Sequence, residues 1–375
     1  MSEEPIDVYI GLDLSCHAEG FHVAGREVTL IHHGFGEVMA LAGIEQLVDQ
    51  AIRSDGPAFD LRPVRGSRPT LMMNQLGRQY DRVRKALREF QDGYVYSVKV
   101  SEFFEACTAV GLRPGDADVD LGEPLDRHPG TGRLNYQLFN ALIDNLRTRG
   151  RGSRYRLRLR RFERNCRRRV GRVLAWEQGM FVWRSRHQFL MLVLGYQAES
   201  RPSVTPERVQ ADLSRFLNNR RTNKLLGGID GYVAKIEEGD ASGLHVHILI
   251  AYAPVTRDDI GIARRIGEYW RDVITQGDGS YWNSNVDKAR HARWGHGVGT
   301  GLINQFDVHA RESLRRNLRY LAKSDQHLRK KGSSKVRVLW MSQPPQKLVP
   351  GRPRTRGAAM PTPACAVTTL DGEAS

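Results

Sequence analysis

The feature that most constrains the fold is a pair of apolar segments separated by a short loop bounded by glycines. Residues Ile229–Glu238 and Leu244–Tyr252 both read as β-strands, and residues 239–243 between them are typical of a hairpin connection. A third segment, Gln188–Tyr196, is apolar almost throughout, which is typical of a buried strand. These three segments predict an antiparallel sheet at the centre of a folded domain.

Helical segments alternate with these strands. Thr205 followed by Pro206 is a typical helix start and predicts a helix to about Asn219. Thr256, with Asp259 three residues later, is interpreted as a capping box that starts the next helix. The other expected elements are a helix over 308–328 and strands over 281–286 and 336–341. Together they predict an α+β fold, with helices packed on one central antiparallel sheet.

The charge distribution divides the chain. Residues 1–130 hold 13 Lys and Arg against 21 Asp and Glu, whereas the rest of the chain holds 44 against 21. A loop over 113–133, rich in Pro and Gly, is the best candidate for a domain boundary. We expect an acidic N-terminal α/β accessory domain over 1–130, an Arg-rich connector over 131–174, the α+β domain over 175–342 and a disordered tail over 343–375. The elements expected in the first domain are a strand over 28–31, helices over 44–52 and 74–91, and a loop over 54–69.

The Arg-rich connector is the main candidate for contact with nucleic acid. Residues 151–172 contain 11 arginines, and the whole chain has a net charge of +15. Arg154, Arg156, Arg158 and Arg160 alternate with other residues, which fits either an edge strand with one cationic face or part of a basic helix. In both cases the side chains can contact phosphates, so these four arginines are predicted to bind DNA. The plainer alternative is an ordinary solvated face.

Several classes of protein are excluded by what the sequence lacks. No apolar stretch approaches the length of about 20 residues that a membrane span needs. The first residues, Met1 to Pro5, are acidic and lack the basic and apolar regions of a signal peptide. The four cysteines are scattered without metal-ligand spacing, as expected in a reducing compartment. These features predict a cytoplasmic protein with no membrane partner.

Two histidines in the second hairpin strand form a candidate metal site. Residues i and i+2 of a strand share a face, so His245 and His247 project from the same side of the sheet, opposite to Val246. The hairpin brings Glu237 beside them, with Glu238 as a competing third ligand. Two imidazoles and a carboxylate suit Mg²⁺ or Mn²⁺ bound with a phosphate, and they also resemble a catalytic zinc set. Two half-exposed histidines without a metal are the plainer alternative.

The expected helix over 308–328 presents a second group of reactive side chains. Its leucines recur at helical spacing and face the core, whereas Tyr320 and Lys323 lie three residues apart on a neighbouring face with Arg316. A tyrosine hydroxyl is a poor nucleophile at its ordinary pKa of about 10, so it needs a nearby metal ion and an ammonium group. We therefore predict Tyr320 and Lys323 as catalytic residues and Arg316 as a DNA contact. The plainer alternative is an amphipathic helix with a packed tyrosine.

Together, the His245-Val246-His247 strand and the Tyr320-Leu321-Ala322-Lys323 helix resemble the motifs of HUH endonucleases, which cut and rejoin single-stranded DNA. The run from Tyr320 to Gln326 is most similar to the replication initiators of filamentous phages (inoviruses). That group is related to the gene II product and to the C-terminal domain family of the YagK and YfjJ prophage proteins. The resemblance covers about residues 175–342. It implies a ferredoxin-like βαββαβ variant of the central sheet.

The resemblance also implies a mechanism. Tyr320 would become joined to a 5′ phosphate, His245 and His247 would bind the metal, and Lys323 would position or neutralise the phosphate. Position 324 is a serine, so the chain resembles the subgroup with a single tyrosine. The implied protein is a rolling-circle replication initiator that acts on origin DNA in the bacterial cytoplasm, with a host helicase and polymerase as further partners.

Two alternatives to a phage initiator remain at this point. A transposase or relaxase of a mobile element would use the same motifs. A DNA-binding regulator without catalytic activity would need only the basic residues. The intact histidines, tyrosine and lysine favour an enzyme.

Overall fold

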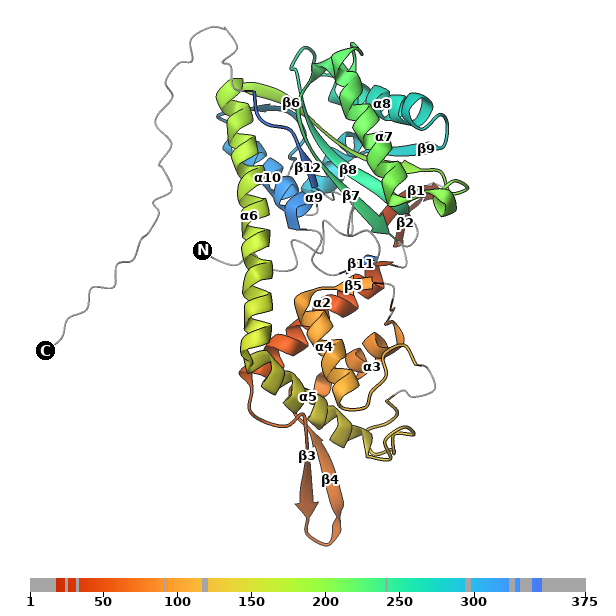
Figure 1. Ribbon diagram of the computed structural model, residues 1–375, viewed down its shortest axis with the longest axis vertical. Coiled ribbons are helices and arrows are strands. Elements are labelled where there is room, and N and C mark those ends of the chain that lie inside the picture. The colour runs from red at the N-terminus through yellow and green to blue at the C-terminus, as the bar shows by residue number, and fades with distance from the viewer. Residues whose placement is uncertain are drawn as a thin grey trace, which may run out of the picture.

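The chain folds into two parts joined by one long helix, α6 (Ser153–Trp183), which runs along the outside of both (Figure 1). The computed structural model describes residues 18–23, 26–31, 34–90, 92, 94–116, 121–239, 242–293, 298–323, 328–330 and 339–345. The N-terminal part is mainly helical and the C-terminal part is built on a sheet, so the expected α+β class is confirmed. None of the helices within these ranges combines the length and the apolarity that crossing a membrane requires.

The C-terminal part contains a six-stranded antiparallel sheet. Across the sheet the strands are β10 (Gly301–Asn304), β6 (Arg186–Tyr196), β8 (Gly243–Tyr252), β7 (Ile229–Gly239) and β12 (Leu339–Met341), and β9 (Gly279–Asn283) also pairs with β6. Side chains alternate along β8: Val246, Ile248 and Ile250 enter one core, whereas Leu249 and Ala251 enter the other. The three strands that the apolar segments predicted are therefore confirmed, and β8 lies at the centre of the sheet.

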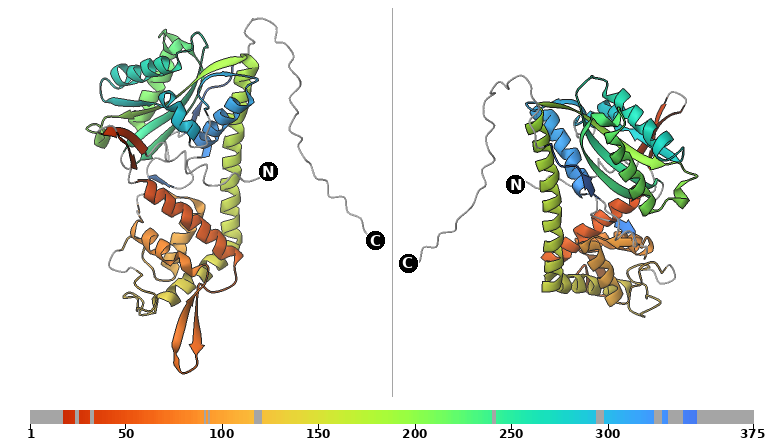
Figure 2. Two further views of the ribbon diagram at one scale, coloured as in Figure 1. Left: turned by 180° about the vertical axis from the view of Figure 1, so that it is seen from behind. Right: turned by 45° about the horizontal axis from the view of Figure 1, so that its top comes forward.

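Helices cover both faces of this sheet. On the face of Val246 lie α7 (Pro206–Asn218) and α8 (Asp259–Tyr269), the latter continued by a π-helical turn over Trp270–Ile274. On the opposite face, α10 (Val308–Lys323) packs beside the C-terminal half of α6, as both views of Figure 2 show. A short helix, α9 (Lys288–Arg293), precedes β10. Single 3-10 turns lie at Gly77–Gln79, Arg201–Ser203, Asn219–Arg221, Leu226–Gly228 and Ser284–Asp287.

The N-terminal part is a helical bundle that carries small two-stranded ribbons. Its helices are α2 (Gly34–Arg53), α3 (Tyr80–Arg88), α4 (Val98–Ala109) and α5 (Asn135–Arg151). Its ribbons are β3 (Phe59–Val64) with β4 (Ser67–Met73), and β5 (Tyr94–Tyr96) with β11 (Leu328–Lys330). A third ribbon, β1 (Ala18–Val23) with β2 (Arg26–Ile31), lies beside the C-terminal sheet (Figure 1). The helices pack around Leu47, Phe103 and Leu142, and Tyr155 at the start of α6 enters the same core.

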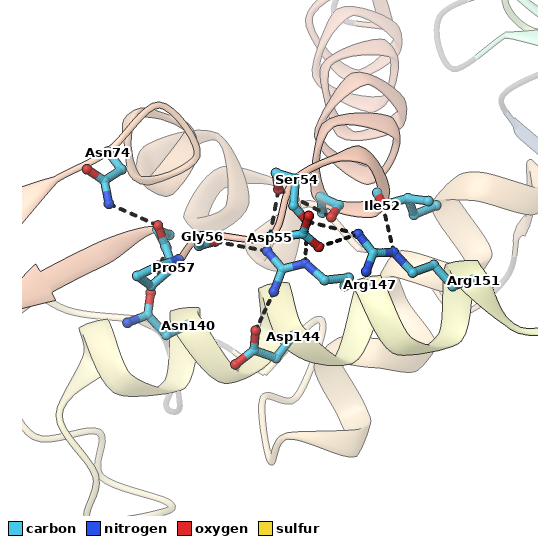
Figure 3. A network of polar contacts seen from close by, with 12 residues as sticks. Ile52, Ser54, Asp55, Gly56, Pro57, Asn74, Asn140, Asp144, Arg147 and Arg151 are labelled. Carbon is cyan, nitrogen blue, oxygen red and sulfur yellow. Dashed lines mark hydrogen bonds and ion pairs between the residues drawn. The ribbon is translucent and has the colours of Figure 1, made fainter.

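A polar network ties α5 to the end of α2 (Figure 3). Arg147 donates hydrogen bonds to the carbonyl oxygens of Ser54 and Gly56 at 2.5 and 2.9 Å. One turn later, Arg151 donates to the Asp55 carboxylate at 2.7 Å. These bonds fix the segment that leads into the β3–β4 ribbon, which projects away from the rest of the N-terminal part (Figure 1).

The helix caps confirm one prediction and correct another. The Thr205 hydroxyl accepts a hydrogen bond from the Arg208 N–H, so α7 begins where the sequence predicts. The capping box at Thr256 is wrong, because the side chain of Asp258 accepts from the Gly261 N–H and α8 begins two residues later than a Thr256 cap would place it. The predicted helix over 308–328 is also too long, since its last residue, Leu328, belongs to β11.

The N-terminal part differs more from the predictions. The expected loop over 54–69 contains β3 and the start of β4. The loop over 113–133 does not separate domains, because α4 and α5 on either side of it pack into one core. The expected boundary at 174–175 falls inside α6, which is continuous there. The proposed disordered tail lies outside the described residues from position 346 onward.

Candidate metal and tyrosine site

The hairpin register brings the predicted metal ligands together. In the antiparallel pairing of β7 with β8, Glu237 stands opposite His245, and Lys235 stands opposite His247. Both histidines share the sheet face of Leu249, which is the face that α10 covers. Glu238 stands opposite Leu244 in this register rather than opposite a histidine. The geometry therefore favours Glu237 over Glu238 as the third ligand.

The three side chains converge closely enough to hold one ion. The Nε2 atoms of His245 and His247 are 3.1 Å apart, and Glu237 Oε2 lies 3.0 Å from His247 Nε2 and 3.9 Å from His245 Nε2. Donor atoms at about 2.1 Å from one ion stand about 3.0 Å apart when cis in octahedral coordination and about 3.4 Å apart in tetrahedral coordination. Among the described residues, these three form a group with metal-ligand spacing. The donor set and its spacing fit a divalent cation.

The surroundings orient each ligand toward its neighbours. The second ring nitrogen of His245, Nδ1, lies 2.9 Å from the carbonyl oxygen of Gly243, which leaves Nε2 directed at His247. The Lys235 ammonium donates to Glu237 Oε1 at 2.9 Å, so the other oxygen faces the histidines. His245 and His247 are 6% and 1% exposed, which excludes the interpretation as two half-exposed histidines on a solvated strand.

The carboxylate of Glu237 is held in its charged form. Burial alone would raise its pKa, but the Lys235 ammonium and then the imidazoles of His247 and His245 outweigh burial and keep the pKa of Glu237 well below its usual range. A largely buried carboxylate that remains ionised beside two imidazoles is a suitable third ligand for a cation.

Helix α10 places Tyr320 against this group. The ring of Tyr320 meets the ring of His247 edge-on, with 6.2 Å between the ring centroids and an interplanar angle of 82°. Leu314, Leu318 and Leu321 of α10 enter the core, as their spacing predicts. Tyr320 is itself only 6% exposed.

A buried ionic cluster fixes α10 to α6. Glu177 of α6 is fully buried and accepts hydrogen bonds from Arg311 at 2.7 and 3.0 Å and from Arg315 at 3.2 Å. The Arg311 guanidinium also lies over the ring of Phe181, 4.5 Å from its centroid. These contacts set the position of the helix that carries Tyr320.

The other predicted residues have mixed outcomes. Lys323 is the last residue of α10, and its side chain lies outside the described residues. Arg316 is half-buried on α10. The run from Arg154 to Arg160 is helical, which decides between the strand and the helix that the alternation left open. Arg158 is half-buried and pairs with Glu102 and Glu105 at 3.3 Å each, so it holds α6 to α4.

Two functional candidates escaped the sequence analysis. Lys235 carried one signal, because it stands two residues before Glu237 and so shares its strand face. Glu177 carried no comparable signal, since its partners are more than 130 residues away along the chain.

Comparison with known proteins identifies no relative of this chain. No protein-family model, no curated protein and no solved structure matches the chain. The function has to be argued from the site itself.

Replacing a ligand should weaken metal binding. We expect His247→Ala to reduce the affinity for Mn²⁺ by at least about tenfold, because removing even an outer-shell partner of a metal ligand costs about 10- to 100-fold. Calorimetric titration of the chelator-treated protein with Mn²⁺ measures this. His309→Ala, an exposed histidine on α10, is the matched control and should bind as the unaltered protein does. Equal affinities for the two variants would show that the cluster does not bind the ion.

Replacing Lys235 should change the response to acid. The lowered pKa of Glu237 contributes stability that is present above about pH 4.3, the ordinary pKa of glutamate, and is lost as the pH falls through the lower folded value. In Lys235→Met, burial acts on Glu237 without the ammonium, so its pKa should rise and acid unfolding should begin at higher pH. Unfolding free energies between pH 3 and 6 measure this. Lys99→Met, at the more exposed pair with Asp49, should shift the profile far less.

Proposed function

We propose that this chain is a metal-dependent tyrosine endonuclease of the HUH type, which nicks and rejoins single-stranded DNA at a phage or prophage origin. The observation that carries the proposal is the convergence of His245, His247 and Glu237 from one hairpin with Tyr320 from a separate helix. Each motif is short, and a core tyrosine or a buried His-x-His pair is ordinary by itself. Their meeting on one sheet face is the geometry that a tyrosine nuclease requires.

The strand order supports the same assignment. Between β6 and β9 the elements follow the order strand, helix, strand, strand, helix, strand. The four strands lie across the sheet as β9, β6, β8, β7, all antiparallel, which is the arrangement of a ferredoxin-like βαββαβ fold. The histidine strand, β8, is central in this arrangement. On this proposal the C-terminal part, built on the six-stranded sheet, forms the catalytic domain, and the N-terminal part is an accessory of unassigned role.

The residues have distinct roles in the proposed reaction. His245, His247 and Glu237 would hold Mg²⁺ or Mn²⁺, which polarises the scissile phosphate when bound. The Tyr320 hydroxyl loses its proton to water and its oxygen bonds to phosphorus while the P–O3′ bond breaks. The departing O3′ takes up a proton. The products are a 5′-phosphotyrosine and a free 3′-OH, and attack by another 3′-OH reverses the step without ATP.

The products of this reaction indicate which host proteins would act with this chain. A free 3′-OH is the substrate of a host polymerase, and a host helicase would separate the displaced strand, so the protein would act in the bacterial cytoplasm. Lys323 and Arg316 belong to the same helix as Tyr320, and we assign them to the scissile phosphate and the adjacent DNA backbone.

Detection of a covalent intermediate tests the proposal. The protein is incubated with Mn²⁺ and single-stranded oligonucleotides from the origin region of its own replicon, and the denatured mixture is analysed by gel and by peptide mapping. We expect a protein–DNA adduct, lost with EDTA, whose linked peptide contains Tyr320. A transposase or relaxase would form the same adduct but at the end of a mobile element or a transfer origin. Binding without any adduct on these substrates would instead identify a DNA-binding regulator and contradict the proposal.

A further inference from the structure

All but one of the arginines of α6 fall into two groups; the exception, Arg169, is half-buried and donates to Cys166 Sγ. Arg158 and, at the end of α5, Arg149 and Arg151 are ion-paired to acidic residues of the N-terminal part. A second group is exposed on α6, and within the described part of the chain none of its members pairs with an acidic side chain. This group, the arginine face, comprises Arg154, Arg156, Arg160, Arg161, Arg164, Arg167, Arg168 and Arg172.

The arginine face lacks internal neutralisation. Glu163 is the one exposed acidic residue of α6, against eight exposed arginines. Like charges at i and i+4, such as those of Arg160, Arg164 and Arg168, destabilise a helix. Releasing counterions from a polyanion offsets that cost. The charge pattern therefore points to a binding partner with a dense row of negative charges.

The length and the composition of the arginine face indicate which type of polyanion it binds. Arg154 and Arg172 are about 27 Å apart along the helix axis, which is close to one turn of B-form DNA at about 34 Å. Surfaces for single strands combine cations with aromatic side chains that stack on bases. None of the five aromatic side chains of α6 is exposed: Tyr155, Phe162, Trp176, Phe181 and Trp183. A face of arginines alone suits phosphate contacts to a duplex backbone.

We propose that the arginine face of α6 binds the duplex that flanks the nick site, over about one helical turn. This inference rests on the proposed function for the position of the nick, but the duplex contact can be tested separately. Because α6 is unbroken and carries Glu177 only about 14 Å further along its axis than Arg168, a duplex bound there has a fixed relation to α10 and Tyr320. Figure 1 shows this helix along the edge of the molecule, beside both parts.

A triple substitution tests the face. Arg160→Gln, Arg164→Gln and Arg168→Gln together remove three exposed charges. Binding to a 30-base-pair duplex is followed by fluorescence anisotropy between about 50 and 200 mM salt. We expect the slope of log affinity against log salt to fall by about 0.9 per arginine, or about 2.7 in all, with at least a tenfold loss of affinity. The matched control removes three exposed arginines elsewhere, Arg78, Arg221 and Arg257, and should leave the slope unchanged.

Two further measurements separate this inference from the proposed nuclease. The triple variant should melt at or slightly above the temperature of the unaltered protein, because it lacks the repulsion between these arginines, and it should form the Tyr320 adduct on single-stranded DNA at the same rate. Unchanged duplex binding by the triple variant would overturn the inference, whether or not the adduct forms. An equal loss of affinity for single strands and duplex would also overturn it, because the face would then be a general track for single strands. Lost duplex binding by a protein that forms no adduct would support the face and reject the nuclease.

Discussion

Tyr320→Phe is expected to abolish the covalent protein–DNA adduct and to leave the fold and DNA binding intact. The substitution removes one oxygen atom, which is the proposed nucleophile. The ring that remains keeps its place in the core beside Leu318 and Leu321, and its edge-on contact with His247. No other atom of the described site has the position and chemistry to replace a phenolic oxygen. Adduct yield on denaturing gels, with binding measured in parallel, checks the result.

Tyr281→Phe is the matched control for this experiment. Tyr281 lies on β9 of the same sheet, and its ring packs on Gly267, so the same chemical change is made away from the metal cluster. It should form the adduct as the unaltered protein does. An adduct that persists in Tyr320→Phe would place the nucleophile elsewhere and remove the central residue of the proposal.

Glu177→Gln is expected to lower the free energy of unfolding by about 3 kcal/mol and to slow adduct formation. The Glu177 side chain has no solvent-accessible surface, and its charge compensates Arg311 and Arg315, which are 12% and 30% exposed. A neutral amide leaves Arg311 without its counter-charge and leaves Arg315 with only Glu312, at 3.8 Å. Breaking a buried pair from one side costs about 3–5 kcal/mol. We expect a loss of unfolding free energy at the lower end of this range because Arg315 is partly exposed to solvent. Urea unfolding measures the change.

Glu312→Gln supplies the comparison for Glu177. Glu312 lies on α10 and pairs with Arg319 and Arg315 at 2.7 and 3.8 Å, but it is 38% exposed, so its removal should cost less than about 1 kcal/mol. Slower adduct formation in Glu177→Gln under folding conditions would show that the cluster positions the tyrosine helix. Equal unfolding free energies for the two variants would contradict the assigned role of Glu177.

The site could be predicted in outline because its motifs are local. Alternation along a strand places His245 and His247 on one face, and a short hairpin loop fixes which residues stand opposite them. Those two rules need no knowledge of distant contacts, and they led to Glu237. The Tyr320 helix was predicted from the spacing of its leucines, and only its C-terminal limit was wrong.

The alternating arginines show where such local rules fail. Arg154 to Arg160 fit a strand period of two, yet the segment is helical. Arginine and leucine are both good helix formers, and Tyr155 and Cys166, eleven residues apart and so on one side of a helix, are both buried. The loop over 113–133 failed as a boundary for a related reason. Pro and Gly mark a turn of the backbone, but they do not reveal whether the flanking helices pack together.

The sequence by itself determined the α+β class, the central strands and the pairing of two histidines with a carboxylate, because all three follow from periodicity and from a hairpin of fixed register. Only the tertiary structure decided that Tyr320 meets His247, that Glu177 holds the tyrosine helix, and that one helix spans both parts of the chain. Those contacts join residues tens to more than a hundred positions apart. Their partners are chosen by how whole helices and sheets bury their apolar faces, which no local pattern encodes.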